Sequence, residues 1–203
     1  SLVNAARVVA ATGGSTNAAL HLPAIANEAG LKFTLRDVVE IYNSTPYIGD
    51  MQPGGKYVAK DLYDIGGVPV VIKSLLDGGY INGDCMTVTG KTIAENHKEI
   101  TFPTNQDVVY TCDKPISENS SVVGLWGNLA PDGCISKIAG LSKLTFKGKA
   151  KCFDSEEDAL TAVLKNEIVA GDAVIIRYEG PKGGPGMREM LSTTGAIYGQ
   201  GLG

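Results

Sequence analysis

Residues 177–191, "RYEGPKGGPGMREML", are the part of this chain best suited to hold a metal ion. The segment is rich in glycine, which is costly to order unless the backbone must approach something closely. Its carboxylates, Glu179 and Glu189, are of the type that Mg²⁺ prefers, and Mg²⁺ usually takes only one or two of them from the protein. We therefore expect a metal site here rather than an ordinary charged surface loop. The residues alone leave either glutamate as the ligand.

A second candidate site is "GGSTN", in which two glycines precede three side chains that form hydrogen bonds, Ser15, Thr16 and Asn17. These side chains stand at the expected start of a helix. The free N–H groups and the dipole of a helix start favour an anion such as a carboxylate or a phosphate. The same residue types are the usual N-cap residues. Anion binding and plain helix capping are therefore equally good interpretations.

A nucleotide site is not indicated. The run Gly90-Lys91-Thr92 resembles the end of a phosphate-binding loop, but Cys85 stands where that motif requires glycine. Without this glycine the backbone cannot wrap a phosphate, so we expect the start of a helix. No Gly-x-Ser-x-Gly motif of a serine hydrolase is present.

The cysteines and histidines do not form a recognisable ligand set either. The cysteines stand far apart without a Cys-x-x-Cys pair, so free thiols in a reducing compartment are expected. Neither histidine has an acidic or cysteine neighbour in the sequence, so both are expected to be structural. The residues are Cys85, Cys112, Cys134, Cys152, His21 and His97.

The composition is that of a soluble globular protein, with 43% hydrophobic and 20% charged residues. The net charge is −4 and the basic residues are dispersed, which argues against a nucleic-acid partner. No apolar run approaches the roughly 20 residues of a membrane helix, and no signal peptide opens the chain. A cytoplasmic protein without a membrane or nucleic-acid partner is therefore expected.

Helical signals dominate the first half of the chain. A helix is expected before the Gly13-Gly14 pair, and a second one from Asn17 to a stop at Gly30. Thr34 and Asp37 form a capping-box-like opening for a third. Further helices fit residues 57–65 and 68–77.

The second half changes to short runs with β-strand character, at residues 106–112, 121–130, 133–140 and 143–153. One helix follows, capped by Ser155, and then a strand that leads into residues 177–191. The order of elements predicts an α/β fold. The polar segment 97–120 marks the expected boundary between two domains, residues 1–105 and 106–203.

Five blocks of this chain, in this order, resemble the dihydroxy-acid dehydratase family. The family belongs to a superfamily with 6-phosphogluconate dehydratase and the sugar-acid dehydratases, and the resemblance covers essentially the whole chain. The blocks are "GGSTNAALHLPAIANEAG", "DLYDIGGVPVVIKSLLDGGYINGDCMTVTGKTIAEN", "GNLAPDGC", "FDSEEDA" and "GDAVIIRYEGPKGGPGMREML".

The resemblance implies a hydro-lyase of valine and isoleucine biosynthesis, which removes water from a 2,3-dihydroxy-3-methyl carboxylic acid to give a 2-keto acid. It implies an iron–sulfur cluster, [2Fe–2S] or [4Fe–4S], that acts as Lewis acid on the 3-hydroxyl. It also implies a Mg²⁺ ion that holds the carboxylate and 2-hydroxyl, and a serine alkoxide that takes the C2 proton. Such chemistry suits a difficult β-elimination.

For the fold, the resemblance implies that residues 1–105 are the helical C-terminal part of an α/β domain that carries the cluster. Residues 106–203 would be most of a swivelling β/β/α domain, and the full-length enzyme would be a homodimer. Its location would be the cytoplasm of a bacterium, or the stroma or matrix of an organelle in a eukaryote.

For the site, the resemblance assigns the Mg²⁺ ligand to Glu189 rather than Glu179, and it suggests substrate contacts for Ser15, Thr16 and Asn17. The cluster cysteines and the other Mg²⁺ ligands are expected upstream of "GGSTN", and the catalytic serine beyond Gly203. The chain, whose two ends look cut, is thus expected to be an internal to C-terminal fragment that holds no catalytic residue and is inactive alone.

Two alternatives stay open. One is a sibling dehydratase that acts on a sugar acid or 6-phosphogluconate, although a further phosphate would require more basic side chains. The other is a non-catalytic swivelling module used for interaction or assembly.

Overall fold

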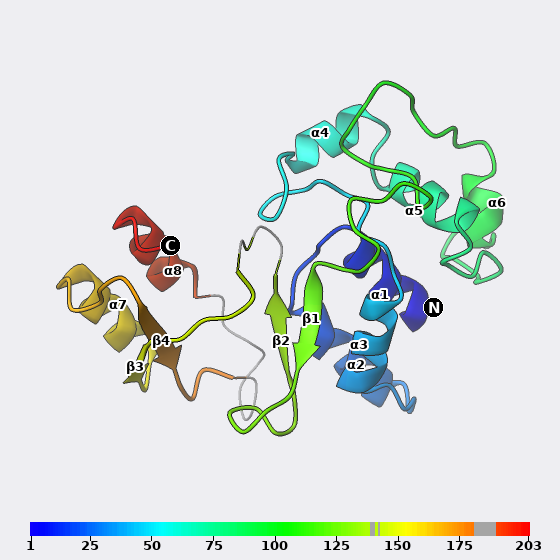
Figure 1. Cartoon of the computed structure of the whole chain (residues 1–203). Helices are drawn as coiled ribbons and strands as arrows, with labels where there is room; N and C mark the ends of the chain where they lie inside the picture. Colours follow the sequence, from blue (N-terminus) through cyan, green and yellow to red (C-terminus); the bar gives the residue numbers. More distant parts are fainter. Residues whose placement is uncertain (139–140, 142, 181–189) are drawn as a thin grey trace. The chain divides into compact units, whose positions relative to one another are not determined.

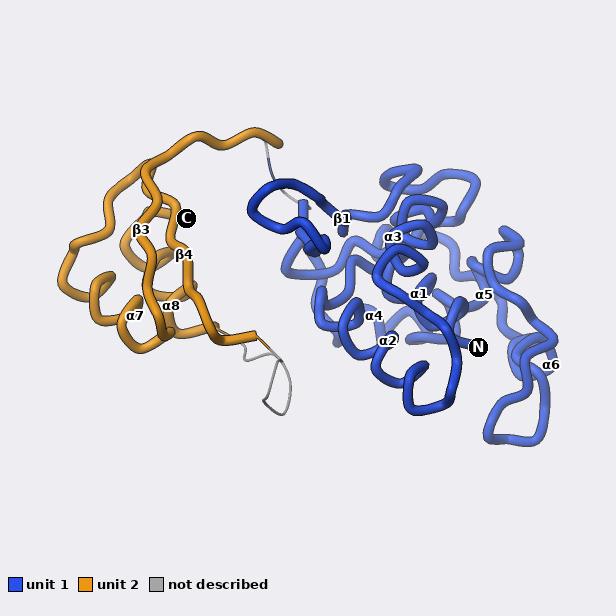
Figure 2. The backbone as a smooth tube through the Cα atoms, turned by 90° about the horizontal axis from the view of Figure 1, so that it is seen from below, with its two compact units in different colours: residues 1–142 blue, residues 143–203 orange. Residues whose placement is uncertain are grey.

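The structure is a computed structural model that describes residues 1–138, 141, 143–180 and 190–203. The chain divides into two compact units, residues 1–142 and 143–203 (Figure 2). Each unit has its own hydrophobic core.

The first unit consists of helices and one β-hairpin (Figure 1). The hairpin strands are antiparallel, and Val122 lies opposite Lys137. The elements are α1 (Leu2–Ala11), α2 (Ala18–Glu28), α3 (Leu35–Asn43), α4 (Ala59–Asp64), α5 (Val68–Asp77), α6 (Ile93–His97), β1 (Val122–Leu125) and β2 (Cys134–Lys137). The helices expected in this half are all present, and α4 begins two residues later than predicted.

Local capping explains where several of these helices begin. The Thr34 hydroxyl accepts a hydrogen bond from the Asp37 N–H, and the Asp37 carboxylate accepts one from the Thr34 N–H, which confirms the predicted capping box of α3. Thr92 and Glu95 form the same arrangement at α6. This confirms that the Gly90-Lys91-Thr92 run opens a helix.

The core of the first unit has two parts. Ala6 and Ala10 of α1 are fully buried, and their small side chains let α1 pack closely with α2 and α3 around Val38 and Tyr42. The second part joins α5 to the segments around Ile48 and Val109.

Residues 106–112 do not form the strand that the sequence predicted. Within this run, Val109 forms an isolated bridge with Gly49 instead of part of a continuous ladder. The Asp50 N–H donates to the Val108 carbonyl at 2.9 Å, and the Tyr110 N–H donates to the Ile48 carbonyl at 2.8 Å. Val108 and Val109 are buried, but too few consecutive residues pair for a strand.

The second unit is a parallel β–α–β arrangement with one more helix. β3 (Lys149–Phe153) and β4 (Asp172–Ile176) pair in register from Lys149 opposite Asp172, and α7 (Glu156–Leu164) connects them. The Ser155 hydroxyl accepts a hydrogen bond from the Asp158 N–H at 3.1 Å, which confirms the predicted cap of α7.

The helix α8 (Leu191–Gly199) was not predicted, because its glycines and small residues give little helical signal. Contacts with the core of the second unit compensate for this low helix propensity. Ala196 and Ile197 lie against the core around Val163, and the Gln200 side chain donates to the Val163 carbonyl at 2.7 Å.

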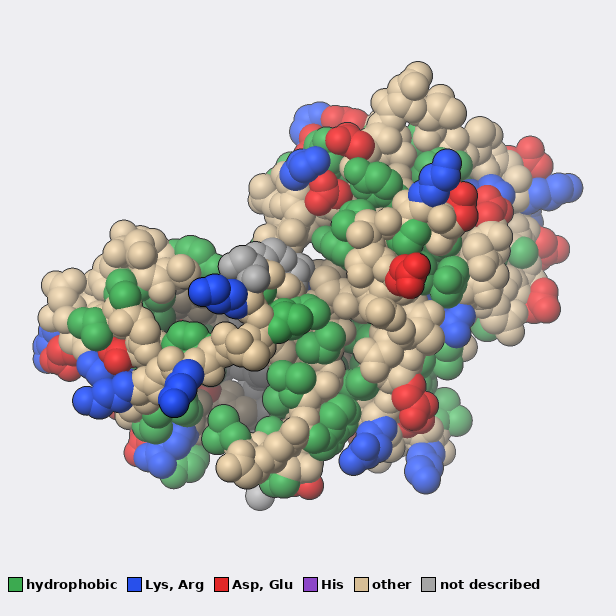
Figure 3. Space-filling model, viewed as in Figure 1, with side chains coloured by type: hydrophobic (Ala, Val, Ile, Leu, Met, Phe, Trp, Pro, Cys, Tyr) green, Lys and Arg blue, Asp and Glu red, His purple; other side chains and the backbone are tan. Residues whose placement is uncertain are grey.

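The predicted α/β class is confirmed by eight helices and two small sheets among the described residues. The expected domain boundary near residue 105 stays a prediction, while the compact units divide after residue 142. None of the described helices is long and apolar enough to cross a bilayer. On the face shown in Figure 3, lysines and arginines are interspersed with aspartates and glutamates.

Candidate substrate cavity

The Gly13-Gly14 turn joins α1 to α2 in a conformation that requires glycine at its first position. Gly13 has φ of +61°, and a Cβ there would lie 2.9 Å from the ring of Tyr47 and 3.0 Å from the hydroxyl of Ser121. The Gly14 N–H donates to the Val9 carbonyl at 2.9 Å, which closes the end of α1. The turn is thereby fixed against the rest of the unit, and it determines where Ser15 lies.

The three polar residues after this turn do not act alike. Asn17 occupies the N-cap position of α2 but makes no capping hydrogen bond with its side chain. Instead, the Ser15 hydroxyl accepts a hydrogen bond from the Asn17 N–H at 3.2 Å, and the Ala18 N–H donates to the Ser15 carbonyl. In the described structure, neither Thr16 nor Asn17 caps α2 with its side chain.

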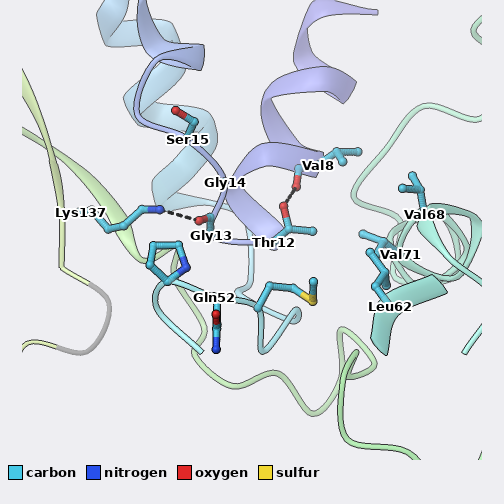
Figure 4. Close-up of a pocket in the computed structure, with 12 residues that line it drawn as sticks. Val8, Thr12, Gly13, Gly14, Ser15, Gln52, Leu62, Val68, Val71 and Lys137 are labelled. Carbon is cyan, nitrogen blue, oxygen red and sulfur yellow. Dashed lines mark hydrogen bonds between the residues drawn. The ribbon is translucent and has the colours of Figure 1, made fainter. Parts of the chain in front are cut away.

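A cavity of about 490 Å³ opens beside this turn (Figure 4). Ser15 lines it together with both glycines, whereas Thr16 and Asn17 are not among its lining residues. The full lining is Val8, Thr12, Gly13, Gly14, Ser15, Met51, Gln52, Pro53, Leu62, Val68, Val71 and Lys137. The volume falls within the roughly 300–1,000 Å³ of small-molecule sites.

The two sides of this cavity differ in chemistry. On one side of the close-up lie Lys137 and the Gly13-Gly14 turn with Ser15, and on the other lie Leu62, Val68 and Val71 (Figure 4). Leu62 belongs to α4, and Val68 and Val71 belong to α5. A cavity with one polar and one aliphatic side suits a small amphipathic ligand.

Lys137 brings a positive charge to the polar side. Its Nζ donates a hydrogen bond to the Gly13 carbonyl at 2.9 Å, so the end of β2 reaches the turn between α1 and α2. The side chain is half-buried, and this burial lowers the pKa of the Lys137 ammonium. No carboxylate forms an ion pair with Lys137 in the part of the chain that the structure describes. Sequence reasoning missed this residue, because nothing local distinguishes it from other strand lysines.

The glycine-rich segment was the other predicted site. Residues 181–189 lie outside the described residues, and with them the predicted ligand Glu189. Of the charged residues before them, Arg177 donates to the Asp154 carboxylate at 2.8 Å from Nε. Glu179 accepts a hydrogen bond from the Glu156 N–H at 2.9 Å. Both therefore have structural contacts within the second unit.

The described residues do not fit an iron–sulfur cluster. The four cysteines are free thiols, and no group of three or more histidine, cysteine, aspartate or glutamate residues in the described ranges could hold a metal ion. Cys112 has a structural role, since its thiol donates a hydrogen bond to the Ser74 carbonyl at 3.3 Å. Burial raises the pKa of the Cys112 thiol, which disfavours the thiolate that a metal would bind. His97 contacts the Ile93 carbonyl of its own helix at 2.7 Å, and His21 is exposed. A cluster would need ligands other than these.

Comparison with known proteins identifies the family. The model of the dihydroxy-acid/6-phosphogluconate dehydratase N-terminal domain matches residues 1–96, and that of the C-terminal domain matches residues 107–203. A dihydroxy-acid dehydratase of Pelagibacter ubique is 66% identical over 203 residues, which are 100% of this chain and 36% of the relative. Dihydroxy-acid dehydratase 2 of Bradyrhizobium diazoefficiens is 61% identical over 202 residues, 100% of this chain and 35% of the relative.

The chain thus spans about a third of the length of the curated relatives it matches. Within that third, the matched region covers the whole of this chain in both relatives. The chain belongs to the dihydroxy-acid/6-phosphogluconate dehydratase family.

Proposed function

We propose that the whole protein is a dihydroxy-acid dehydratase. It would remove the C2 hydrogen and the C3 hydroxyl of a 2,3-dihydroxy-3-methyl carboxylic acid as water, and the resulting enol would tautomerise to a 2-keto acid. The products would serve valine and isoleucine biosynthesis. The identity of 54–66% to several relatives named dihydroxy-acid dehydratase supports this proposal.

The cavity lining favours this substrate over those of the sibling dehydratases. Leu62, Val68 and Val71 offer an aliphatic surface, which suits a methyl or ethyl branch and leaves sugar hydroxyls without partners. Lys137 is the one cationic side chain among the described lining residues. A 6-phosphogluconate site would need further cations for the phosphate.

We propose Mg²⁺ and an iron–sulfur cluster as the cofactors of the whole protein, with Glu189 as one ligand of the Mg²⁺ ion. The cluster ligands and the catalytic serine would come from parts of the relatives that this chain does not span. Ser15 is the strongest substrate contact of the three proposed, because it lines the cavity, whereas Thr16 and Asn17 would act from the adjoining turn. We further propose that the whole protein is a homodimer located in the cytoplasm, or in an organelle if the source is a eukaryote.

The experiment is a comparison of substrates with the full-length protein. Purified protein, with its cluster intact and Mg²⁺ added, is incubated with 2,3-dihydroxy-3-methylbutanoate, gluconate or 6-phosphogluconate, and the 2-keto product is measured. We expect turnover of the branched acid at a kcat/KM well above those of the other two. Turnover of gluconate or 6-phosphogluconate alone would contradict the proposal.

A further inference from the structure

Lys137 is an ammonium kept half-buried beside the cavity without an opposite charge in the described residues. A partly buried charge without a counter-ion costs free energy. An ammonium also has three N–H donors, and the described structure gives this one a single acceptor, the Gly13 carbonyl. An anion in the cavity would supply both the missing charge and further acceptors.

The remainder of the cavity limits what this anion can be. Its far side is formed by aliphatic side chains of α4 and α5, of which Val68 is 53% exposed and so available for contact. A large or fully hydroxylated anion would leave polar groups against this surface without hydrogen-bond partners. A small acid with a branched alkyl group satisfies both sides at once.

We propose that this cavity binds a small branched-chain aliphatic carboxylate, with Lys137 as the cation that pairs with the carboxylate and Val68 as a contact for the alkyl branch. The inference rests on the proposed function and assigns two residues to substrate recognition. A carboxylate has two oxygens that accept several hydrogen bonds. Pairing with Lys137 therefore leaves acceptor positions for a second cation.

The contact of Lys137 with Gly13 gives it a second effect. The same ammonium that pairs with the ligand also holds the carbonyl of the turn that carries Ser15. Ligand charge and turn position are thereby coupled through one side chain. Arginine at this position would keep the charge, whereas methionine would keep most of the length and lose it.

The test measures binding to the full-length protein by calorimetry, independently of turnover. The probe is 2-hydroxy-3-methylbutanoate, which has the carboxylate and the branch but lacks the 3-hydroxyl that would leave. We expect Lys137→Met to weaken its Kd about 10- to 100-fold, as for loss of a hydrogen bond to a charged group. Lys137→Arg should restore most of the affinity, and Lys147→Met, at an exposed lysine, should bind like the wild type.

A neutral probe separates recognition of charge from damage to the fold. The amide 2-hydroxy-3-methylbutanamide should bind equally weakly to the wild type and to Lys137→Met. Equal loss of affinity for acid and amide would show that Lys137 only supports the structure and would overturn the proposal. An unchanged Kd for the acid in Lys137→Met would overturn it too.

The aliphatic side has its own matched pair of variants. Val68→Thr keeps the shape of the side chain but replaces one methyl group with a hydroxyl, so it should weaken binding of 2-hydroxy-3-methylbutanoate about 3- to 10-fold. It should leave binding of glycolate, which has no branch, unchanged. The control is Val88→Thr, at a fully exposed valine outside the cavity. Equal affinity of Val68→Thr and the wild type for the branched acid would remove Val68 from the proposal.

These outcomes differ from those that would refute the proposed function. A protein that binds the branched acid through Lys137 but dehydrates only sugar acids would refute the function and retain the cavity assignment. A protein that dehydrates the branched acid with the same KM in Lys137→Met as in the wild type would retain the function and refute the assignment.

Discussion

The Glu179 carboxylate accepts a hydrogen bond from the Glu156 backbone N–H at 2.9 Å, so a residue that follows β4 holds the first turn of α7. An anion at a helix N-terminus is stabilised by the free N–H groups and the helix dipole. This contact gives Glu179 a structural role. Glu189, which lies outside the described residues, stays the predicted metal ligand.

The same substitution at both glutamates tests this division of roles. Glu179→Gln keeps an acceptor for the Glu156 N–H but loses its charge, so it should lower the free energy of unfolding by up to about 1 kcal/mol and leave turnover of the folded enzyme unchanged. Glu189→Gln should leave unfolding unchanged and lower kcat at least about 100-fold. Even mutation of a residue that only hydrogen-bonds to a metal ligand typically lowers metal affinity or activity 10- to 100-fold. The opposite pattern of effects would move the metal ligand to Glu179.

Gly13→Ala should destabilise the first unit more than an ordinary glycine substitution. A left-handed conformation costs an L-residue about 1–2 kcal/mol, and crowding against Tyr47 and Ser121 should add about 1–3 kcal/mol. Gly30→Ala is the matched control, since its φ is +69° but a Cβ there would meet nothing within 4 Å. Denaturant unfolding of the two variants measures the difference, and equal losses of stability would show that the crowding is relieved by small shifts.

Much of this fold could be predicted because its signals are local. The capping box of Thr34 and Asp37 involves residues three apart, and Ser155 caps α7 through Asp158 in the same way. The Gly13-Gly14 pair also marked the end of α1 correctly. Such features depend only on neighbours along the chain, so one sequence contains all the information that determines them.

The cavity could not be predicted in the same way. Lys137 reaches the Gly13 carbonyl across 124 positions of the sequence, and only the folded hairpin brings the two together. Helix α8 was missed for a related reason, because its stability comes from contacts with Val163 and not from its own composition. The sequence singled out Ser15, which lines the cavity, but it gave no signal for Lys137, which lines the same cavity.

The capping box of α3 should make stability depend on pH in acid. Hydrogen bonds from the Thr34 hydroxyl and backbone hold the pKa of the Asp37 carboxyl below its ordinary value of 3.8. A carboxyl with a lowered pKa in the folded state stabilises the protein above its unfolded pKa, and the effect is lost as the pH falls through the folded pKa. Asp37→Asn should therefore be less stable than the wild type at pH 7. This difference in stability should become smaller below about pH 4.

The measurement for Asp37 is thermal unfolding from pH 7 to pH 3 for both proteins. Glu40→Gln, on the same helix, controls for the change in net charge, because Glu40 takes no part in the capping box. A gap between wild type and Asp37→Asn that stays constant down to pH 3 would show that the carboxylate charge contributes nothing to the cap.

The buried amide of Asn4 offers a sharper test, because its partner is a peptide group. Asn4 Nδ2 donates to the Asn82 carbonyl and Asn4 Oδ1 accepts from the Asn82 N–H, both at 2.9 Å, which ties α1 to the turn after α5. The residue is 7% exposed. Asn4→Asp replaces the donor with a second acceptor facing a carbonyl, and should cost about 1–3 kcal/mol of stability at pH 7.

Acid should restore the stability of Asn4→Asp, because a protonated carboxyl has one O–H donor and one carbonyl acceptor, as the amide does. The folded pKa of this aspartate would then lie above its unfolded value of about 3.9. The restored stability is fully present below the unfolded pKa and is lost as the pH rises to the folded pKa. Asn82→Asp is the control, since its side chain accepts a hydrogen bond from the Asp84 N–H at 2.9 Å, a role that a carboxylate keeps. If Asn4→Asp stays equally destabilised relative to the wild type from pH 7 to pH 4, the loss comes from something other than the missing donor.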